Sequence, residues 1–251
     1  MTNDRLLASL MSGSAIPVKR HGLLGVIAGG GNGGFDKTGI KVYYQFNEAS
    51  GVLENKATTA NGFSDGTGST NDSQTVGSSV VYGDSGIIGD SFGFNNTAGS
   101  YVDVGNDIIS GTGSFSFNMW VYTTALSGNQ AGMTGGNNQA ICQFQASTGK
   151  YILGNTPTLA TTTNASNNTW SMVSYSRSSG GDSKTYFNGS LENTGSNSTN
   201  IITGDWFIGG QVPNISEGWK GRIDECLVSD IEMTGDQFTE LYNSGAGLAL
   251  I

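Results

Sequence analysis

The chain has 251 residues but few of the types on which several kinds of active site depend. It has one histidine, His21, and two cysteines, Cys142 and Cys226. Because His21 lies in a basic run ahead of the strand-rich part of the sequence, that part can hold neither a Ser-His-Asp triad nor a multi-histidine zinc site. The cysteines do not form a disulfide framework, so they are either one pair that closes a long loop or two buried thiols.

Charged residues are also few, at 12% of the chain, and they are unevenly distributed. Residues 1–37 carry four bases and two acids, whereas the remainder carries seven bases and 18 acids, a net charge of −11. An acidic body argues against nucleic acid as a partner, and its acids are either a solvated surface or include cation ligands. No stretch approaches the roughly 20 apolar residues of a membrane span, so none is predicted.

What the chain does have is 40 glycines, together with many Ser, Thr and Asn residues, a composition that suits short strands and turns better than helices. The 11 Phe, 9 Tyr and 4 Trp residues argue against disorder. From Ile40 onward, short aromatic and β-branched runs such as IKVYYQF, SFSFNMWVY and TWSMVSYSR alternate with turn residues. Asn188-Gly189 is a strong hairpin signal. We therefore predict an all-β, two-sheet antiparallel jelly-roll sandwich.

One helix is expected near the end of the chain. Thr234 and Gln237 have the spacing of a capping box, and Gly245 supplies a stop. The apolar stripe of this helix consists of Phe238, Leu241 and Tyr242. The strand before it, residues 221–229, alternates with Ile223, Glu225 and Leu227 on one face. The helix can thus dock on a sheet and cover it.

The closing segment, G-x-I-D-E-x-x-V followed by a helix ending L-Y-N-x-G, resembles the end of concanavalin A-like, laminin-G-like jelly-roll domains. Other segments fall in the order that this family uses: VYYQFNEASG, IIGDSFGFN, YVDVGN, GSFSFNMWVY, TWSMVSYSR and KTYFNGSLE. The resemblance spans about Lys41 to Gly245. It implies a laminin-G-like fold and binding of glycans or protein partners.

Many members of this family carry a calcium ion that joins the first and last strands. The resemblance places its ligands at Glu48 of FNEASG and Asp224 of GRIDE, with backbone carbonyls completing an oxygen shell. Asn47 stands where the family has an aspartate, which removes one charge from the site. The alternative is that both acids cap turns or pair with Lys220 or Arg222.

A candidate ligand site lies on the strand SFSFNMWVY. Phe115, Phe117, Met119 and Val121 form its core-facing side. On the other side, Trp120 and Tyr122 could form a sugar-stacking platform; alternatively, Trp120 packs under a loop or the helix or lies in a subunit contact. The E-x-D-x-x-E motif of related glycoside hydrolases is absent, so no catalytic residue is assigned and no enzyme is predicted.

Residues 1–34, the N-terminal arm, precede a predicted domain of residues 35–251. The arm combines a short amphipathic helix, a basic cluster, the apolar run LLGVIA and a glycine-rich hinge. Its predicted assembly residues are Leu6, Leu10, Arg20, Leu23 and Leu24. This layout is similar to that of bacteriophage appendage or decoration proteins, and it predicts a virion structural protein that forms a homo-oligomer. Its arm is expected to contact other virion proteins, and its head to be displayed for attachment to glycans or to the host surface. The alternative is an extracellular, exported bacterial lectin-like protein.

Overall fold

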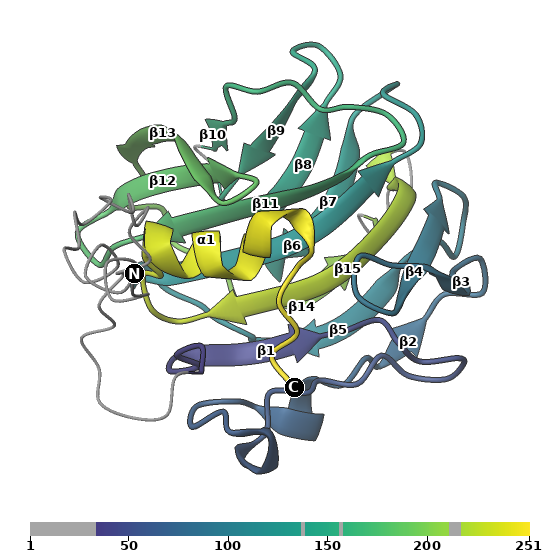
Figure 1. The fold of residues 1–251 in the computed structure, drawn as a ribbon, viewed down its shortest axis with the longest axis horizontal. Coiled ribbons are helices and arrows are strands. Elements are labelled where there is room, and N and C mark those ends of the chain that lie inside the picture. The colour runs from purple at the N-terminus through teal and green to yellow at the C-terminus, as the bar shows by residue number, and fades with distance from the viewer. Residues whose placement is uncertain (1–33, 137–138, 156–157, 211–216) are drawn as a thin grey trace, which may run out of the picture. The chain divides into compact units, whose positions relative to one another are not determined.

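The computed structural model describes residues 34–136, 139–155, 158–210 and 217–251. Residues Phe35–Ile251 form one unit, in which two antiparallel sheets pack face to face (Figure 1). The predicted sandwich is therefore confirmed.

Sheet A has the strand order β13-β12-β11-β6-β15-β4-β3, and β1 pairs with β15 beside β4. Its strands are β1 (Ile40–Tyr44), β3 (Val81–Ser85), β4 (Asp90–Asn95), β6 (Phe115–Thr123), β11 (Trp170–Arg177), β12 (Asp182–Phe187), β13 (Ser190–Ser196) and β15 (Lys220–Ser229). Both β1 and β4 occupy the same side of β15, because the first pairs with its end and the second with its beginning.

Sheet B has the order β10-β9-β8-β7-β14-β5-β2. Its strands are β2 (Thr75–Val76), β5 (Val102–Asn106), β7 (Gln130–Gly135), β8 (Gln139–Gln145), β9 (Lys150–Leu153), β10 (Leu159–Ala160) and β14 (Asp205–Ile208). The helical elements of the described chain include the 3-10 turns η2 (Thr59–Asn61), η3 (Gly68–Asn71) and η6 (Asn243–Gly245) and the helix α1 (Gly235–Tyr242).

The alternation along β6 separates the two faces of sheet A. Phe117, Met119 and Val121 are buried in the core between the sheets, as predicted. Trp120 points to the opposite face, where it belongs to a second apolar cluster. That cluster also includes Tyr43, Met172, Tyr186, Leu227, Phe238, Leu241 and Leu250. Sheet A therefore buries apolar side chains on both of its faces.

The hairpin between β12 and β13 turns at the predicted dipeptide. Asn188 has φ 51° and Gly189 has φ 75°, the positive values that a type I′ turn needs at both central residues. Phe187 pairs with Ser190 across the turn. The local sequence thus favours this turn, and distant residues also hold it: Asn188 Oδ1 accepts from Met172 N at 2.9 Å, and the Gly189 carbonyl accepts from Thr239 Oγ1 of α1 at 3.1 Å.

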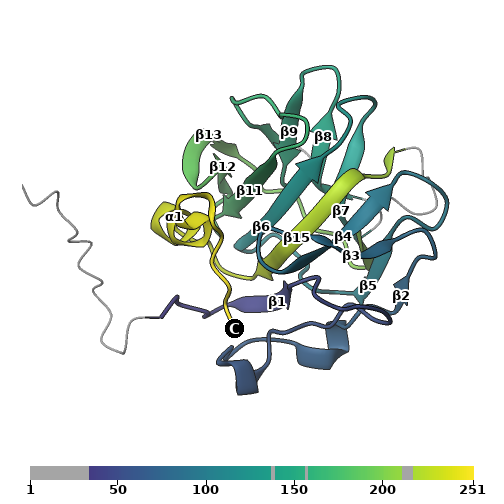
Figure 2. The same cartoon turned by 45° about the vertical axis from the view of Figure 1, so that its right-hand side comes forward.

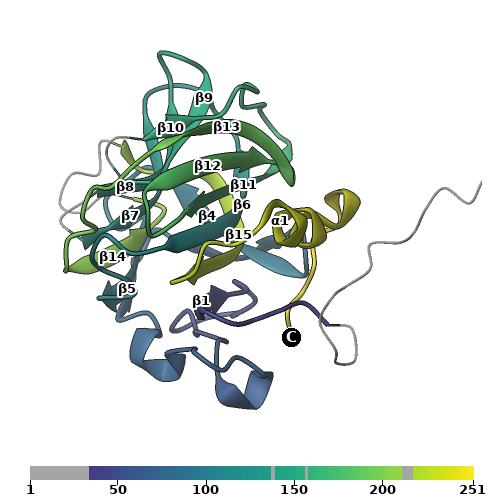
Figure 3. The ribbon, with the colours of Figure 1, turned by 90° about the vertical axis from the view of Figure 1, so that its left-hand side faces the viewer.

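Helix α1 covers part of the outer face of sheet A, in front of β6 and β11 in the view of Figure 1 and at its side in Figure 3. The capping box of Thr234 and Gln237 is present. The helix ends at Tyr242, because Asn243 takes the left-handed conformation; the predicted stop, Gly245, instead closes the following 3-10 turn. Within the described ranges, no helix is long and apolar enough to cross a bilayer.

Strand β15 departs from simple alternation at Glu225, which has φ 47° and lies in a β-bulge opposite β6. The bulge adds a residue and shifts the following side chains to the other face. Ile223 belongs to the core between the sheets, whereas Leu227 belongs to the cluster beneath α1. The prediction that these two residues share a face was therefore wrong.

Candidate functional site

Five directly paired residues form a row across sheet A. Trp170 of β11 is opposite Tyr122 of β6, which is opposite Arg222 of β15; Arg222 is opposite Gly93 of β4, and Gly93 is opposite Val81 of β3. Residues paired in this way project to the same face of a sheet. The row is on the outer face, since Tyr122 and Trp120 are two residues apart on β6.

Aromatic and cationic groups contact one another at one end of this row. The Arg222 guanidinium lies 3.8 Å from the centroid of the Tyr122 ring and 5.4 Å from that of Trp170. The two rings are in turn 5.5 Å apart, edge to face. Arg222 Nη1 also donates a 2.7 Å hydrogen bond to the carbonyl oxygen of Ser85 on β3. The row is therefore held by stacking and by a strand-to-strand hydrogen bond.

A pocket of about 380 Å³ opens beside these residues, over β3, β4, β15 and β6, which lie next to one another in Figure 2. Its lining consists of Val81, Asp84, Gly93, Phe94, Asn95, Tyr122, Thr124, Asn168, Gly221 and Arg222. This lining mixes an aromatic ring and aliphatic surface with hydroxyl, amide, carboxylate and guanidinium groups. Such a mixture suits a small polar ligand that also has apolar faces.

The two predicted platform residues have different surroundings. Tyr122 lines the pocket and is half-buried, and its role in ligand binding stays a prediction. Trp120 is only 2% exposed, and its indole stacks on Tyr242 of α1 with 5.6 Å between centroids. Because the helix covers this ring, it has no open face for a sugar. The alternative placement, under the helix, is the one observed.

The predicted metal ligand Asp224 is fully buried and bonded to backbone amides. Its Oδ2 accepts from Ile87 N at 2.8 Å and Ile88 N at 3.1 Å, and its Oδ1 accepts from Glu225 N at 2.9 Å. Glu225, beside it, accepts a short hydrogen bond from the Tyr43 hydroxyl, while its Oε1 is buried without a partner. These contacts tie the bulge to β1 and to the loop before β4.

Burial perturbs both carboxyl groups in this cluster. Desolvation raises the pKa of Asp224 to about 7, against the lowering effect of its three amide hydrogen bonds. Desolvation likewise raises the pKa of Glu225 to about 8, and the neighbouring Asp224 charge adds to this effect. At neutral pH Glu225 therefore holds its proton, which suits a residue in an apolar interior.

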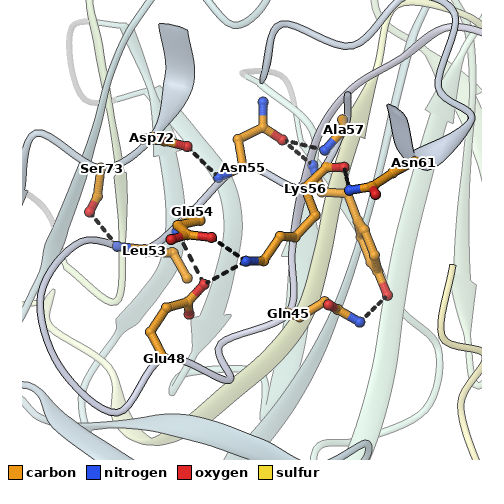
Figure 4. Close-up of polar contacts among 11 residues, drawn as sticks. Gln45, Glu48, Leu53, Glu54, Asn55, Lys56, Ala57, Asn61, Asp72 and Ser73 are labelled. Atoms are coloured by element: carbon orange, nitrogen blue, oxygen red, sulfur yellow. Dashed lines mark hydrogen bonds and ion pairs between the residues drawn. The ribbon is translucent and has the colours of Figure 1, made fainter. Parts of the chain in front are cut away.

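The other predicted ligand, Glu48, belongs to a separate network (Figure 4). Its Oε1 accepts from Glu54 N at 3.2 Å and lies 3.7 Å from Lys56 Nζ; its Oε2 is buried without a hydrogen-bond partner. Glu48 and Asp224 share no hydrogen-bond partner, and the described residues contain no group of three or more His, Cys, Asp or Glu placed to hold a metal. The predicted calcium site, in which backbone carbonyls complete the shell around Glu48 and Asp224, stays a prediction.

Several residues of the candidate site were not singled out from the sequence. Trp170, Gly93 and Asp84 come from three strands, and only the cross-strand register brings them near Tyr122. The only local signal was an aromatic residue at the start of TWSMVSYSR. The predicted assembly residues Leu6, Leu10, Arg20, Leu23 and Leu24 lie outside the described residues.

Solved structures with a similar fold include one domain of a glycoside hydrolase and two toxin binding domains. The fourth domain of AbnA, an extracellular arabinanase from Geobacillus stearothermophilus in complex with arabinotriose, matches at a TM-score of 0.55 and 17% identity over 80% of this chain and 97% of that one. The binding domain of botulinum neurotoxin serotype G matches at a TM-score of 0.58 and 16% identity, over 81% of this chain and 50% of that one. The binding domain of Paraclostridial Mosquitocidal Protein 1 matches at a TM-score of 0.61 and 14% identity, over 82% of this chain and 52% of that one.

This chain therefore spans about half the length of the two toxin structures. At such identities the likeness concerns the fold. A search of curated proteins found no relative by sequence. A family model for laminin-G-like domains of the concanavalin A-like lectin/glucanases superfamily matches residues 95–238, which is more than half of the chain. The chain belongs to this concanavalin A-like lectin/glucanases superfamily, with a laminin-G-like domain.

Proposed function

We propose that this chain is a non-catalytic glycan-binding protein and that its glycan site is the pocket beside Tyr122. The observation that carries the proposal is the row Trp170–Tyr122–Arg222, which borders an open pocket with hydroxyl, amide and carboxylate groups. The apolar face of a sugar ring packs on aromatic surface, and its hydroxyl groups need polar partners around it. This pocket offers both kinds of contact.

The same lining argues against glycoside hydrolysis. That reaction normally needs two carboxyl groups on either side of the scissile bond, one as acid and one as nucleophile or base. Asp84 is the one carboxylate in the pocket lining. The similar AbnA domain, described in complex with arabinotriose, agrees with a binding role, and so do the two toxin binding domains.

The test is a glycan array probed with the full-length chain, followed by titration of the bound sugars. Trp170→Ala and Tyr122→Ala should each weaken binding at least about tenfold, if a sugar ring gains from an aromatic side chain as much as a stacked nucleic-acid base does, on the order of 1–3 kcal/mol. Tyr101→Ala removes an aromatic ring that packs on Phe207 of sheet B and is the matched control. Binding that survives both Tyr122→Ala in the pocket lining and Trp170→Ala beside it would refute this site.

The setting of this binding is a further part of the proposal. The basic, apolar composition of the N-terminal arm supports display of the head on a virus particle, with the arm joining neighbouring virion subunits and the chain forming a homo-oligomer. The full-length chain with both Leu23→Asp and Leu24→Asp should no longer co-sediment with virus particles but should still bind sugar. Equal co-sedimentation of this variant and the wild type would favour the alternative, an extracellular bacterial lectin-like protein.

A further inference from the structure

The carboxylate of Asp84 is an unused hydrogen-bond acceptor in the pocket. It has neither a hydrogen bond nor an ion pair in the described part of the chain, and it lies over Gly93 of the neighbouring strand. A Cβ atom at position 93 would be 2.4 Å from Asp84 Oδ2 and 3.2 Å from Val81 Cβ. The carboxylate can therefore occupy this place only because residue 93 has no side chain.

Arg222 does not neutralise this carboxylate by a direct bond. Its guanidinium stacks on Tyr122 and donates through Nη1 to the Ser85 carbonyl, and no ion pair joins it to Asp84 in the described structure. An anionic ligand in the pocket would thus meet both the Arg222 guanidinium, which is engaged with Tyr122 and Ser85, and a carboxylate that has no bonded cation. The formal net charge of −9 over the chain also disfavours the approach of an anion.

The remaining polar groups of the pocket are neutral and largely uncommitted. Asn95 uses its Oδ1 to accept from Thr97, which leaves its Nδ2 as a donor. The side chains of Asn168 and Thr124, which also line the pocket, have no hydrogen-bond partner in the described structure. Amide and hydroxyl groups can pair with sugar hydroxyls, each of which donates one hydrogen bond and accepts others.

We propose that this pocket binds a neutral sugar and that Asp84 accepts hydrogen bonds from two adjacent hydroxyl groups of it. The inference rests on the proposed function and specifies its ligand class. A carboxylate has two acceptor oxygens and no donor, so it matches a vicinal diol, which presents two O–H donors side by side. The same carboxylate repels uronic, sialic and sulfated sugars. Asp84 is thus a specificity-determining residue, and Gly93 provides the space that it occupies.

The experiment compares sugars that differ only in an acidic group. Each sugar is titrated separately into the full-length chain and followed by calorimetry. Two neutral sugars are compared with their acidic counterparts, lactose with 3′-sialyllactose and galactotriose with trigalacturonic acid, and arabinotriose is measured alone. We expect at least one neutral sugar to bind, and its acidic counterpart to bind at least tenfold more weakly at 50 mM NaCl. Binding of the neutral sugar should change less than twofold between 50 and 500 mM NaCl, because no charge on the ligand is screened.

Asp84→Asn should weaken binding of the neutral sugar at least tenfold and should narrow the gap between the neutral and acidic sugars. Asp182→Asn, which removes an exposed acid from β12 and changes the net charge equally, is the matched control and should bind like the wild type. Melting curves establish that both variants fold, and the wild-type comparison of sugar pairs needs no variant.

Two results would overturn the inference and are distinguishable from each other. An acidic sugar that binds as tightly as its neutral counterpart, with binding strengthened by Asp84→Asn, would leave glycan binding in place and refute the ligand class. Failure of every sugar, neutral and acidic, to bind would refute the proposed function together with the inference.

Discussion

Replacing Glu225 by glutamine tests the physical account of the buried bulge in β15. Glu225 is only 3% exposed. Its carboxyl group accepts a hydrogen bond from the Tyr43 hydroxyl, and its Oε1 atom is buried without a hydrogen-bond partner. The Tyr43 hydroxyl also accepts from Leu250 N at 3.1 Å, so the cluster connects the bulge to the end of the chain. Glutamine keeps a carbonyl oxygen for Tyr43 but cannot ionise.

The expected effect depends on pH because burial raises the pKa of Glu225 from 4.5 to about 8. Below about pH 4.5 the folded and unfolded wild type both hold the proton, so the raised pKa has no effect on stability. Between that pH and about pH 8 only the folded state holds it, and the free energy of unfolding falls by about 1.4 kcal/mol per pH unit. At pH 7 the loss is on the order of 3 kcal/mol, and it stops growing above about pH 8.

The Glu225→Gln variant escapes this loss. We therefore expect its free energy of unfolding to be close to that of the wild type at pH 4.5 and to exceed it by on the order of 4 kcal/mol at pH 8. Guanidinium denaturation followed by tryptophan fluorescence at pH 4.5, 6, 7 and 8 measures the difference. Asp182→Asn, at an exposed acid, should show no such trend. A difference that stays constant with pH, or one that turns against the glutamine as pH rises, would refute the reasoning.

Three further predictions concern other parts of the fold. Arg177 is buried, and its Nε and Nη atoms donate five hydrogen bonds to backbone carbonyls and to the amide oxygen of Asn155, with no carboxylate among the acceptors. Arg177→Met should lower the free energy of unfolding in urea by about 3–5 kcal/mol, because the acceptors are left without donors. A decrease of less than about 1 kcal/mol would show that water replaces the lost donors. Leu241→Ala beneath α1 should cost about 2–5 kcal/mol in the same assay, while an unchanged midpoint would mean that the helix does not stabilise sheet A. Because Glu48 and Asp224 belong to separate networks, the melting temperature of the protein should be the same in EDTA and in millimolar calcium. If calcium at 100 times its dissociation constant instead raises the free energy of unfolding by about 2.7 kcal/mol, the calcium site is established.

Elements that depend on neighbouring residues could be predicted from the sequence. The hairpin at Asn188-Gly189 follows from positive φ values that these two residues tolerate, and the helix start follows from the side chains of Thr234 and Gln237. The inward face of β6 follows from a period of two. Each of these features has a signal within a few residues, so it could be predicted without knowledge of the distant contacts that also hold it.

The candidate site was predicted only in part. Tyr122 was recognised from the pattern of its own strand, whereas its neighbours Trp170, Arg222 and Gly93 reach it through the register of three other strands. Register between strands far apart in the sequence is set by the packing of the whole sheet, and single-strand periodicity carries no information about it. The row that carries the functional proposal was therefore invisible before the structure.

The sequence by itself determined the fold class, the alternating faces of the strands and the caps and turns that end them, because these follow from local backbone preferences and from the need to bury aromatic side chains. Only the tertiary structure decided which outward-facing aromatic is covered and which is open. Trp120 and Tyr122 are two residues apart on the same face of β6, yet α1 packs on the first and leaves the second beside the pocket. The bulge at Glu225 likewise belongs to the tertiary structure, because it is defined by the register of β15 against β6, which the periodicity of β15 alone does not contain.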